Sequence, residues 1–157
     1  MKLEKDKLGL AAEFAVASEL CRRNIYAQLT LGLRKRTDIL IETEQGMLRI
    51  QVKSKQGREW PGCKGISGEG IILVFVDYEN KNDNDRPDFY ILTVQDWEDV
   101  LERELILTGK VKRNEVRIEK NIPIWTDGYA GMSVLPSMIK QYKEKWDKFV
   151  GIIGTDG

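Results

Sequence analysis

The sequence predicts an α/β protein, and three observations point to this fold class. Apolar residues recur at helical spacing between residues 3 and 23. Two strand-like segments then follow within residues 38–54, separated by a short turn. A continuous apolar run at 71–76 precedes a strand and helix at 88–104. A leading helix, several strands and a further strand–helix unit together indicate an α/β domain.

The first expected element is a helix from Leu3 to about Arg23. Glu13 lies three residues from Leu10 and from Val16, so a carboxylate sits on or beside the inward-facing side. One explanation is a boundary residue whose carboxylate reaches water; the other is a place in a functional site. The apolar residues that define the helical spacing are Leu10, Phe14, Ala17, Leu20 and Cys21.

Three strands are expected next. Residues 25–31 carry β-branched and aromatic side chains suited to a first strand. Residues 38–42 and 47–54 flank Glu44-Gln45-Gly46, which is short enough to close an antiparallel hairpin. Side chains alternate between the faces of a strand, so residues 48, 50 and 52 share one face of the second hairpin strand. Arg49, Gln51 and Lys53 share the other.

The glycine-rich segment 56–70 predicts a mobile loop beside this hairpin. It contains neither the GK[ST] of a P-loop nor a dinucleotide fingerprint leading into a helix, so nucleotide binding is not expected there. The run 71–76 (IILVFV) is typical of a central strand that is covered on both faces.

The remaining elements are expected in the order strand, helix, weak strand, helix. Thr93 is placed to cap a helix over 94–104, after a strand at 88–92. Residues 111–118 alternate weakly, as an edge strand would. A final helix begins at Ser133 or Pro136 and runs to about residue 150. Its lysines are either solvated or in contact with phosphate; they are Lys140, Lys143, Lys145 and Lys148.

The length of 157 residues suits a single domain, with a core at about 3–105 and an appendage that carries the final helix at about 133–150. Charged residues make up 32% of the chain, and the apolar content is ordinary, so neither a disordered chain nor a membrane protein is expected. The 25 basic and 25 acidic residues cancel. A DNA partner is therefore argued from local clusters, which are Arg34-Lys35-Arg36 and the group Lys53, Lys55, Arg58 and Lys64.

Cysteine and histidine usage narrows the chemistry. Cys21 and Cys63 have neither metal-ligand spacing nor a disulfide framework, and the first residues lack the apolar run of a signal peptide. These features predict a reducing, cytoplasmic location. The chain has no histidine, which excludes Ser-His and Cys-His catalysis and any His-bound zinc site.

Polar groups gather around the expected hairpin in a pattern that suits phosphodiester hydrolysis. Such a reaction needs a divalent cation to activate water and a nearby positive charge to stabilise the transition state. Asp38 is the expected direct ligand, with the Gln51 amide oxygen and the Val52 carbonyl as further oxygen donors. Lys53 would orient the water or stabilise the developing charge. Glu13 would hold a second metal or metal-bound water.

Gly9-x-x-x-Glu13, Asp38 and Gln51-Val52-Lys53 together resemble the motif of the PD-(D/E)XK nuclease superfamily. The Gln-Val-Lys version is similar to that of a group I intron homing endonuclease of this class. Holliday-junction resolvases resemble the arrangement too. The resemblance covers roughly residues 9–54, with weaker similarity through 71–76 and 88–104.

This resemblance implies a restriction-endonuclease-like core of the αβββαβ type, with a mixed sheet flanked by helices. It also implies Mg²⁺-dependent cleavage of DNA, with Mn²⁺ as a substitute, by a homodimer or homotetramer. By position, Asp38 and Gln51 become metal-site residues, Lys53 the catalytic lysine and Glu13 the helix-borne acid. The chain departs from the motif where Thr37 replaces a proline and Gln51 replaces an acid. The segment 56–70 also lacks the usual crossover helix.

Two other functions follow from the same residues. Because Gln51 lowers the negative charge that would hold a metal, the chain is alternatively a weak or inactive nuclease-fold module that binds nucleic acid. A third function is that of an interaction subunit, in which the polar residues simply face solvent. These alternatives predict different outcomes for metal binding and for DNA binding.

Overall fold

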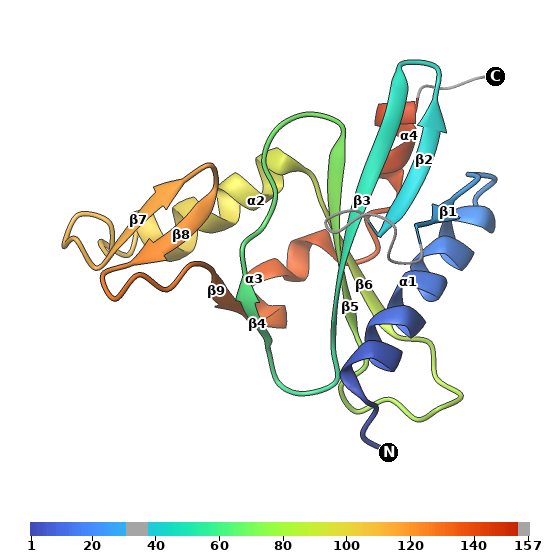
Figure 1. Ribbon diagram of the computed structural model, residues 1–157, viewed down its shortest axis with the longest axis horizontal. Coiled ribbons are helices and arrows are strands. Elements are labelled where there is room, and N and C mark those ends of the chain that lie inside the picture. The colour runs from blue at the N-terminus through green and yellow to red at the C-terminus, as the bar shows by residue number, and fades with distance from the viewer. Residues whose placement is uncertain (31–37, 154–157) are drawn as a thin grey trace.

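A five-stranded mixed sheet forms the centre of the protein (Figure 1). The computed structural model describes residues 1–30 and 38–153. The strand order is β1-β2-β3-β5-β6; β3 and β5 are parallel and the other neighbours are antiparallel. The α/β class with a mixed sheet is therefore confirmed. The strands of the sheet are β1 (Gln28–Leu29), β2 (Ile39–Thr43), β3 (Gly46–Lys55), β5 (Ile71–Asp77) and β6 (Asp88–Leu92).

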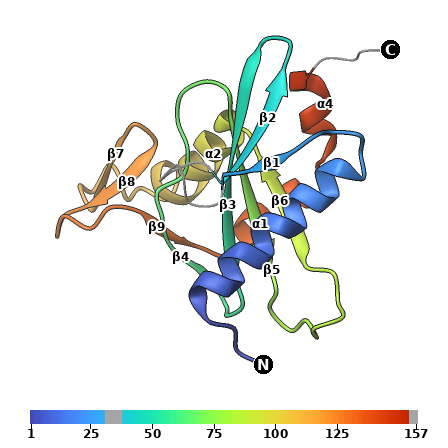
Figure 2. The same ribbon diagram turned by 45° about the vertical axis from the view of Figure 1, so that its right-hand side comes forward.

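One face of the sheet is covered by α1 (Lys5–Cys21), which lies over β3 (Figure 2). The prediction of the helix is confirmed, but the prediction of its inward side is wrong in part. Leu10, Phe14 and Cys21 are exposed. Smaller side chains at neighbouring positions pack against the sheet and allow a close approach of the helix. The buried apolar residues of α1 are Ala12, Val16, Ala17 and Leu20.

The predicted hairpin is confirmed as β2 and β3. Ile39 pairs with Ile50 and Thr43 with Gly46. Gly46 has a φ of +123°, which suits the turn because glycine lacks the Cβ that disfavours this conformation. Ile39, Leu48 and Ile50 are buried against α1 and neighbouring strands, so the hairpin is anchored in the core on the same face as the helix.

The connection between β3 and β5 is not the mobile loop that the sequence predicts. It contains no helix, as expected, but it forms β4 (Trp60–Cys63), which pairs with β9 (Met132–Val134). Trp60 is buried, and its indole N–H donates to the Val76 carbonyl at 3.2 Å. Gly65 lies against the Trp97 indole, where any Cβ would clash. Buried anchors therefore hold this glycine-rich segment on the sheet.

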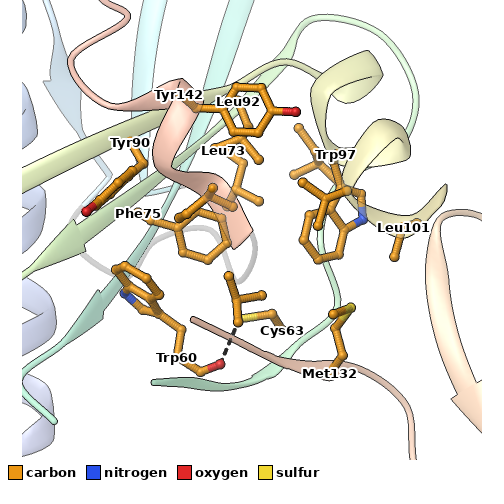
Figure 3. Close-up of a cluster of buried hydrophobic side chains, with 14 of the residues drawn as sticks. Trp60, Cys63, Leu73, Phe75, Tyr90, Leu92, Trp97, Leu101, Met132 and Tyr142 are labelled. Carbon is orange, nitrogen blue, oxygen red and sulfur yellow. Dashed lines mark hydrogen bonds between the residues drawn. The ribbon is translucent and has the colours of Figure 1, made fainter. Parts of the chain in front are cut away.

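A second apolar cluster fills the opposite face of the sheet (Figure 3). The Trp60 ring meets Phe75 and Tyr90 edge-on, with centroids 4.9 and 5.9 Å apart. Trp97 and Leu101 enter from α2 (Val94–Leu101), in the region where the sequence predicts a helix. The sheet thus carries one core under α1 and another under β4 and α2. The prediction that β5 is covered on both faces is confirmed.

The segment after β6 begins as predicted and then diverges. The Thr93 hydroxyl accepts from the Asp96 N–H at 3.2 Å, and the Asp96 carboxylate accepts from the Thr93 N–H at 2.9 Å, so a capping box starts α2. The helix then widens into a π-helix at Glu102–Ile106. Instead of an edge strand at 111–118, a separate antiparallel hairpin follows, made of β7 (Val116–Glu119) and β8 (Ile122–Trp125).

The single final helix is a wrong prediction. After β9 the chain forms α3 (Pro136–Ile139), a short 3₁₀ turn at Lys140–Tyr142, and α4 (Asp147–Ile153). The helix breaks because Lys143 bridges to Tyr90 of β6 and the Glu144 N–H donates to the Phe89 carbonyl at 2.9 Å. Glu144 has a φ of +56°, which no α-helix accommodates.

Two lysines of this segment have structural partners. Lys148 contacts the Asp96 carboxylate, and Lys143 lies 3.5 Å from that of Asp88. Beyond the break, Trp146 and Phe149 join the core under α1. Within the described part of the chain, none of the helices combines the length and apolarity needed to cross a bilayer.

Candidate functional site

Asp38 stands immediately before β2 and is held by backbone groups of β3. Its N–H donates to the Ile50 carbonyl at 3.1 Å, and its carboxylate Oδ2 accepts from the Val52 N–H at 2.7 Å. These two contacts flank Gln51. The hairpin therefore fixes both the backbone and the carboxylate of Asp38 against the strand that carries the other predicted site residues.

Glu13 meets Asp38 from the covering helix. The Glu13 side chain is partly buried and shares a hydrogen bond with the Asp38 side chain. Burial, the negative charge of Asp38 and this hydrogen bond raise the pKa of Glu13 from 4.5 to about 7. Two carboxylates this close disfavour full ionisation of both, so the pair favours a bound proton or cation. The structure thus brings together the two acids that the sequence indicates.

Gln51 and Lys53 follow on β3, but their side chains leave the strand on the face opposite Val52. They pair in register with Leu73 and Phe75, whose side chains belong to the second core. Val52 packs on the α1 side. Burial raises the pKa of the Cys63 thiol to about 12, and the positive charge of Lys53 opposes that rise. Lys53 therefore lies on the same side of the sheet as the second core, near Cys63 of β4.

The donor set suits a hard cation. Among the described residues, no group of three or more His, Cys, Asp or Glu side chains is arranged so that it could hold a metal ion. The available groups are two carboxylates, from Glu13 and Asp38, with the amide of Gln51 and the carbonyl of Val52 on the neighbouring strand. All are oxygen ligands of the kind that Mg²⁺ takes, and Mg²⁺ commonly binds through one or two carboxylates with water completing the shell.

A surface cleft of about 1020 Å³ adjoins this site. Gly9, one helical turn before Glu13, lines it together with Val52 and Lys53. Lys2 and Lys5 add two exposed positive charges to its wall. The cleft therefore places lysines along one side of the candidate site, where they would attract a phosphate backbone.

Lys2 and Lys5 are residues that the sequence interpretation missed. Gln56 holds the N-terminal segment beside β3: its Oε1 accepts from the Leu3 N–H at 2.8 Å, and its Nε2 donates to the Met1 carbonyl at 2.7 Å. These contacts join residues more than fifty positions apart. No local sequence pattern signals them.

The other residues predicted to contact phosphate differ in their exposure to solvent. Arg58 and Lys64 are exposed on the crossover connection. Lys55 is instead buried, and its ammonium group lies 2.7 Å from the Asp77 carboxylate and 2.9 Å from that of Glu79. These carboxylates neutralise its charge inside the protein, so Lys55 does not face a ligand. The cluster Arg34, Lys35 and Arg36 lies outside the described residues.

The comparisons with known proteins return no matching family model, no matching curated protein and no matching solved structure.

Proposed function

We propose that the protein is a Mg²⁺-dependent DNA endonuclease with a restriction-endonuclease-like core. The observation that carries this proposal is the Glu13–Asp38 carboxylate pair, held by α1 and the β2–β3 hairpin at the border of a lysine-lined cleft. A helix packed over an antiparallel hairpin, followed by a parallel strand, supports the same core.

Each residue has a distinct role in this proposal. Asp38 and Gln51, with the Val52 carbonyl, would hold a divalent cation, and Glu13 would be a further ligand on the helix side. A bound cation would supply Lewis-acid activation of the scissile phosphate and of water. Lys53 provides the positive charge that stabilises the developing phosphorane oxygens. Lys2 and Lys5 attract the phosphates on one side of the scissile bond, because their ammonium groups displace condensed counterions.

The test is a cleavage assay on supercoiled, linear and branched DNA with Mg²⁺ or Mn²⁺. We expect Asp38→Ala and Lys53→Ala to lower the cleavage rate by about 100-fold or more, the magnitude seen when one transition-state contact is removed. Lys7→Ala is the matched control, because Lys7 is exposed and its ammonium group pairs with the exposed Glu4 carboxylate. The proposal fails if no DNA is cut, or if Asp38→Ala cuts as fast as the unchanged protein.

Gln51 favours one alternative, a module that binds nucleic acid without cleaving it. An amide in place of a carboxylate removes one negative charge from the donor set and weakens cation binding. Metal titration separates the two functions. Salt-sensitive DNA binding without a Mg²⁺ or Mn²⁺ site would support the binding module. Gln51→Glu would then be expected to tighten metal binding and is the informative variant.

A further inference from the structure

A second cavity lies beyond β4, away from the acid pair. Its volume is about 540 Å³, and it is bounded by the π-helix, the end of β8 and β9. Trp125 and Tyr129 contribute aromatic rings, and Leu105, Met132 and Met138 contribute apolar side chains. Its charged groups are Glu104, Lys110 and Asp127. The proposed cleavage chemistry uses none of these residues.

The cavity and the lysine-lined cleft meet across the β4–β9 ribbon. Gly62 lines the cleft, and a Cβ added there would lie 3.0 Å from the Tyr129 hydroxyl oxygen. Gly131 allows the two backbones to approach, since its Cβ would lie 3.0 Å from the Gly62 carbonyl carbon. Cys63 lies near Lys53, whose positive charge opposes the rise that burial causes in the pKa of the Cys63 thiol. In the β4–β9 ribbon Cys63 pairs with Met132, which lines the cavity. A chain of direct neighbours thus links Lys53 to the aromatic cavity.

The aromatic residues of the cavity are held in place. The Trp125 indole N–H donates to the Gly131 carbonyl at 2.7 Å, and the Lys110 ammonium lies 5.8 Å from the centre of its ring system. The Tyr129 N–H donates to the Asp127 carboxylate at 2.9 Å, which fixes the turn that carries it. Tyr129 is nevertheless 51% exposed. Fixed and partly open rings are suited to stacking against another flat ring.

The cleft and the aromatic cavity differ in charge, and this difference indicates which part of a nucleotide each would bind. The cleft is lined by the lysines at positions 2, 5 and 53 and by one exposed carboxylate, Glu59, so positive charge predominates and attracts phosphate. The cavity places two carboxylates, Glu104 and Asp127, and one lysine, Lys110, beside the rings, so negative charge predominates. Carboxylates repel phosphate but accept hydrogen bonds from the exocyclic amino groups of bases. A strand with its backbone in the cleft would therefore turn a base, and not a phosphate, toward Trp125 and Tyr129.

We infer that this cavity binds the bases of a single-stranded segment of the nucleic acid whose backbone occupies the cleft. The inference rests on the proposed function and narrows its substrate to DNA with an unpaired strand beside the cleavage point. Bases within a duplex are stacked on their neighbours, so their faces are not available to a protein ring. Unpaired bases stack on aromatic side chains with little dependence on sequence.

Tryptophan fluorescence provides a direct test. Trp125 is partly exposed, whereas Trp60, Trp97 and Trp146 are each at least 95% buried. We expect an unstructured oligodeoxynucleotide, titrated in EDTA to prevent cleavage, to quench the fluorescence of the unchanged protein. A blunt duplex of equal length should quench it far less. Trp125→Phe should abolish the fluorescence change, which assigns the quenching to Trp125.

Tyr129 supplies the paired variants. Tyr129→Ala should weaken oligonucleotide binding by about 5-fold to 100-fold, the usual effect of removing one stacking ring, and Tyr129→Phe should retain it. Matching thermal melting of the two variants controls for folding. Equal affinity of Tyr129→Ala and the unchanged protein, or equal quenching by duplex and single strand, overturns the inference.

The two proposals fail separately. If the protein cleaves duplex DNA and Tyr129→Ala cleaves it at the same rate, the nuclease proposal is supported and the base-binding cavity is overturned. Quenching of Trp125 by single strands, without cleavage of any DNA, would overturn the nuclease and support base binding.

Discussion

Glu13 and Glu19 lie six residues apart on α1, and their surroundings shift their pKa values in opposite directions. The Glu13 carboxyl group faces Asp38, and its pKa rises to about 7. The Glu19 carboxylate is almost fully buried, yet its pKa falls to about 2, chiefly because Arg86 donates a hydrogen bond to it. The Arg86 Nε lies 2.8 Å away and an Arg23 nitrogen 2.7 Å away.

The comparison teaches that burial alone does not mark a functional acid. Glu19 is the more buried of the two, but guanidinium groups satisfy its charge, so it ties α1 to the β5–β6 connection as a structural anchor. Glu13 has a second carboxylate as its neighbour. Unsatisfied charge, held in place by the fold, is what makes a carboxylate ready to bind a proton or a cation.

The largest expected effect on stability comes from removing Glu19, the carboxylate that guanidinium groups neutralise. Glu19→Ala leaves Arg86 and Arg23 without their shared partner. The carboxylate is buried but both arginines reach solvent, so losing these charge-assisted hydrogen bonds should cost about 2 to 3 kcal/mol in free energy of unfolding. Urea denaturation at pH 7 measures the change. Glu4→Ala, which removes an exposed pair with Lys7, is the control and should change stability by less than about 0.5 kcal/mol. A loss below about 1 kcal/mol for Glu19→Ala would contradict the anchoring role.

A smaller effect with the opposite sign is expected at Glu13. Its folded pKa is raised, so its contribution to stability is fully present below pH 4.5 and is lost as the pH rises through about 7. Glu13→Gln removes this titration. The variant should be about 1 to 2 kcal/mol more stable than the unchanged protein at pH 8 without metal, and equally stable at pH 4. This stability difference is smaller than the full pKa change of Glu13 would give, because water reaches part of its side chain and screens the charge.

Urea denaturation at several pH values in EDTA measures this difference. Glu19 supplies the internal contrast: its pKa is lowered, so its contribution is present above pH 4.5 and is lost as the pH falls toward 2. The same pH profile for Glu13→Gln and the unchanged protein between pH 4.5 and 8 would show that Glu13 and Asp38 are not coupled.

The smallest expected effect comes from a conservative change at Arg86. Its guanidinium contacts both Glu144 carboxylate oxygens, at 2.5 and 3.0 Å, while its Nε reaches Glu19. Lysine cannot form this forked arrangement, so Arg86→Lys should cost about 1 kcal/mol. Arg117→Lys, at an exposed pair with Glu119, is the matched control. Equal melting temperatures for both variants would mean that charge alone, without the planar fork, anchors Glu19.

The sequence predicts the acid pair well because local patterns place each member. Helical spacing puts Glu13 beside the inward side of α1, and strand alternation with a short turn puts Asp38 next to Gln51. Contacts across long separations carry no such signal. Glu19 meets Arg86 from 67 positions away, and Lys55 meets Asp77 across the parallel pair β3–β5. The burial of Lys55 and the clamped lysine-rich N-terminus were therefore not predictable from the chain.

The final helix shows the same limit in another form. The spacing of its apolar residues fits a continuous helix, and local propensity contains no break. Tertiary hydrogen bonds to β6 outweigh this preference at Lys143 and Glu144. Likewise, glycines in 56–70 indicate flexibility in isolation, whereas buried Trp60, Cys63 and Ile66 fix the segment on the sheet.

The break at Lys143 and Glu144 also protects the sheet. β6 is the outermost strand at its end of the order, and an uncovered edge strand can recruit another chain by backbone pairing. The bridge at Tyr90 and the bond from the Glu144 N–H to Phe89 occupy part of that edge. The opposite edge, β1, is only two residues long. The fold therefore limits strand-by-strand aggregation at both ends of the sheet.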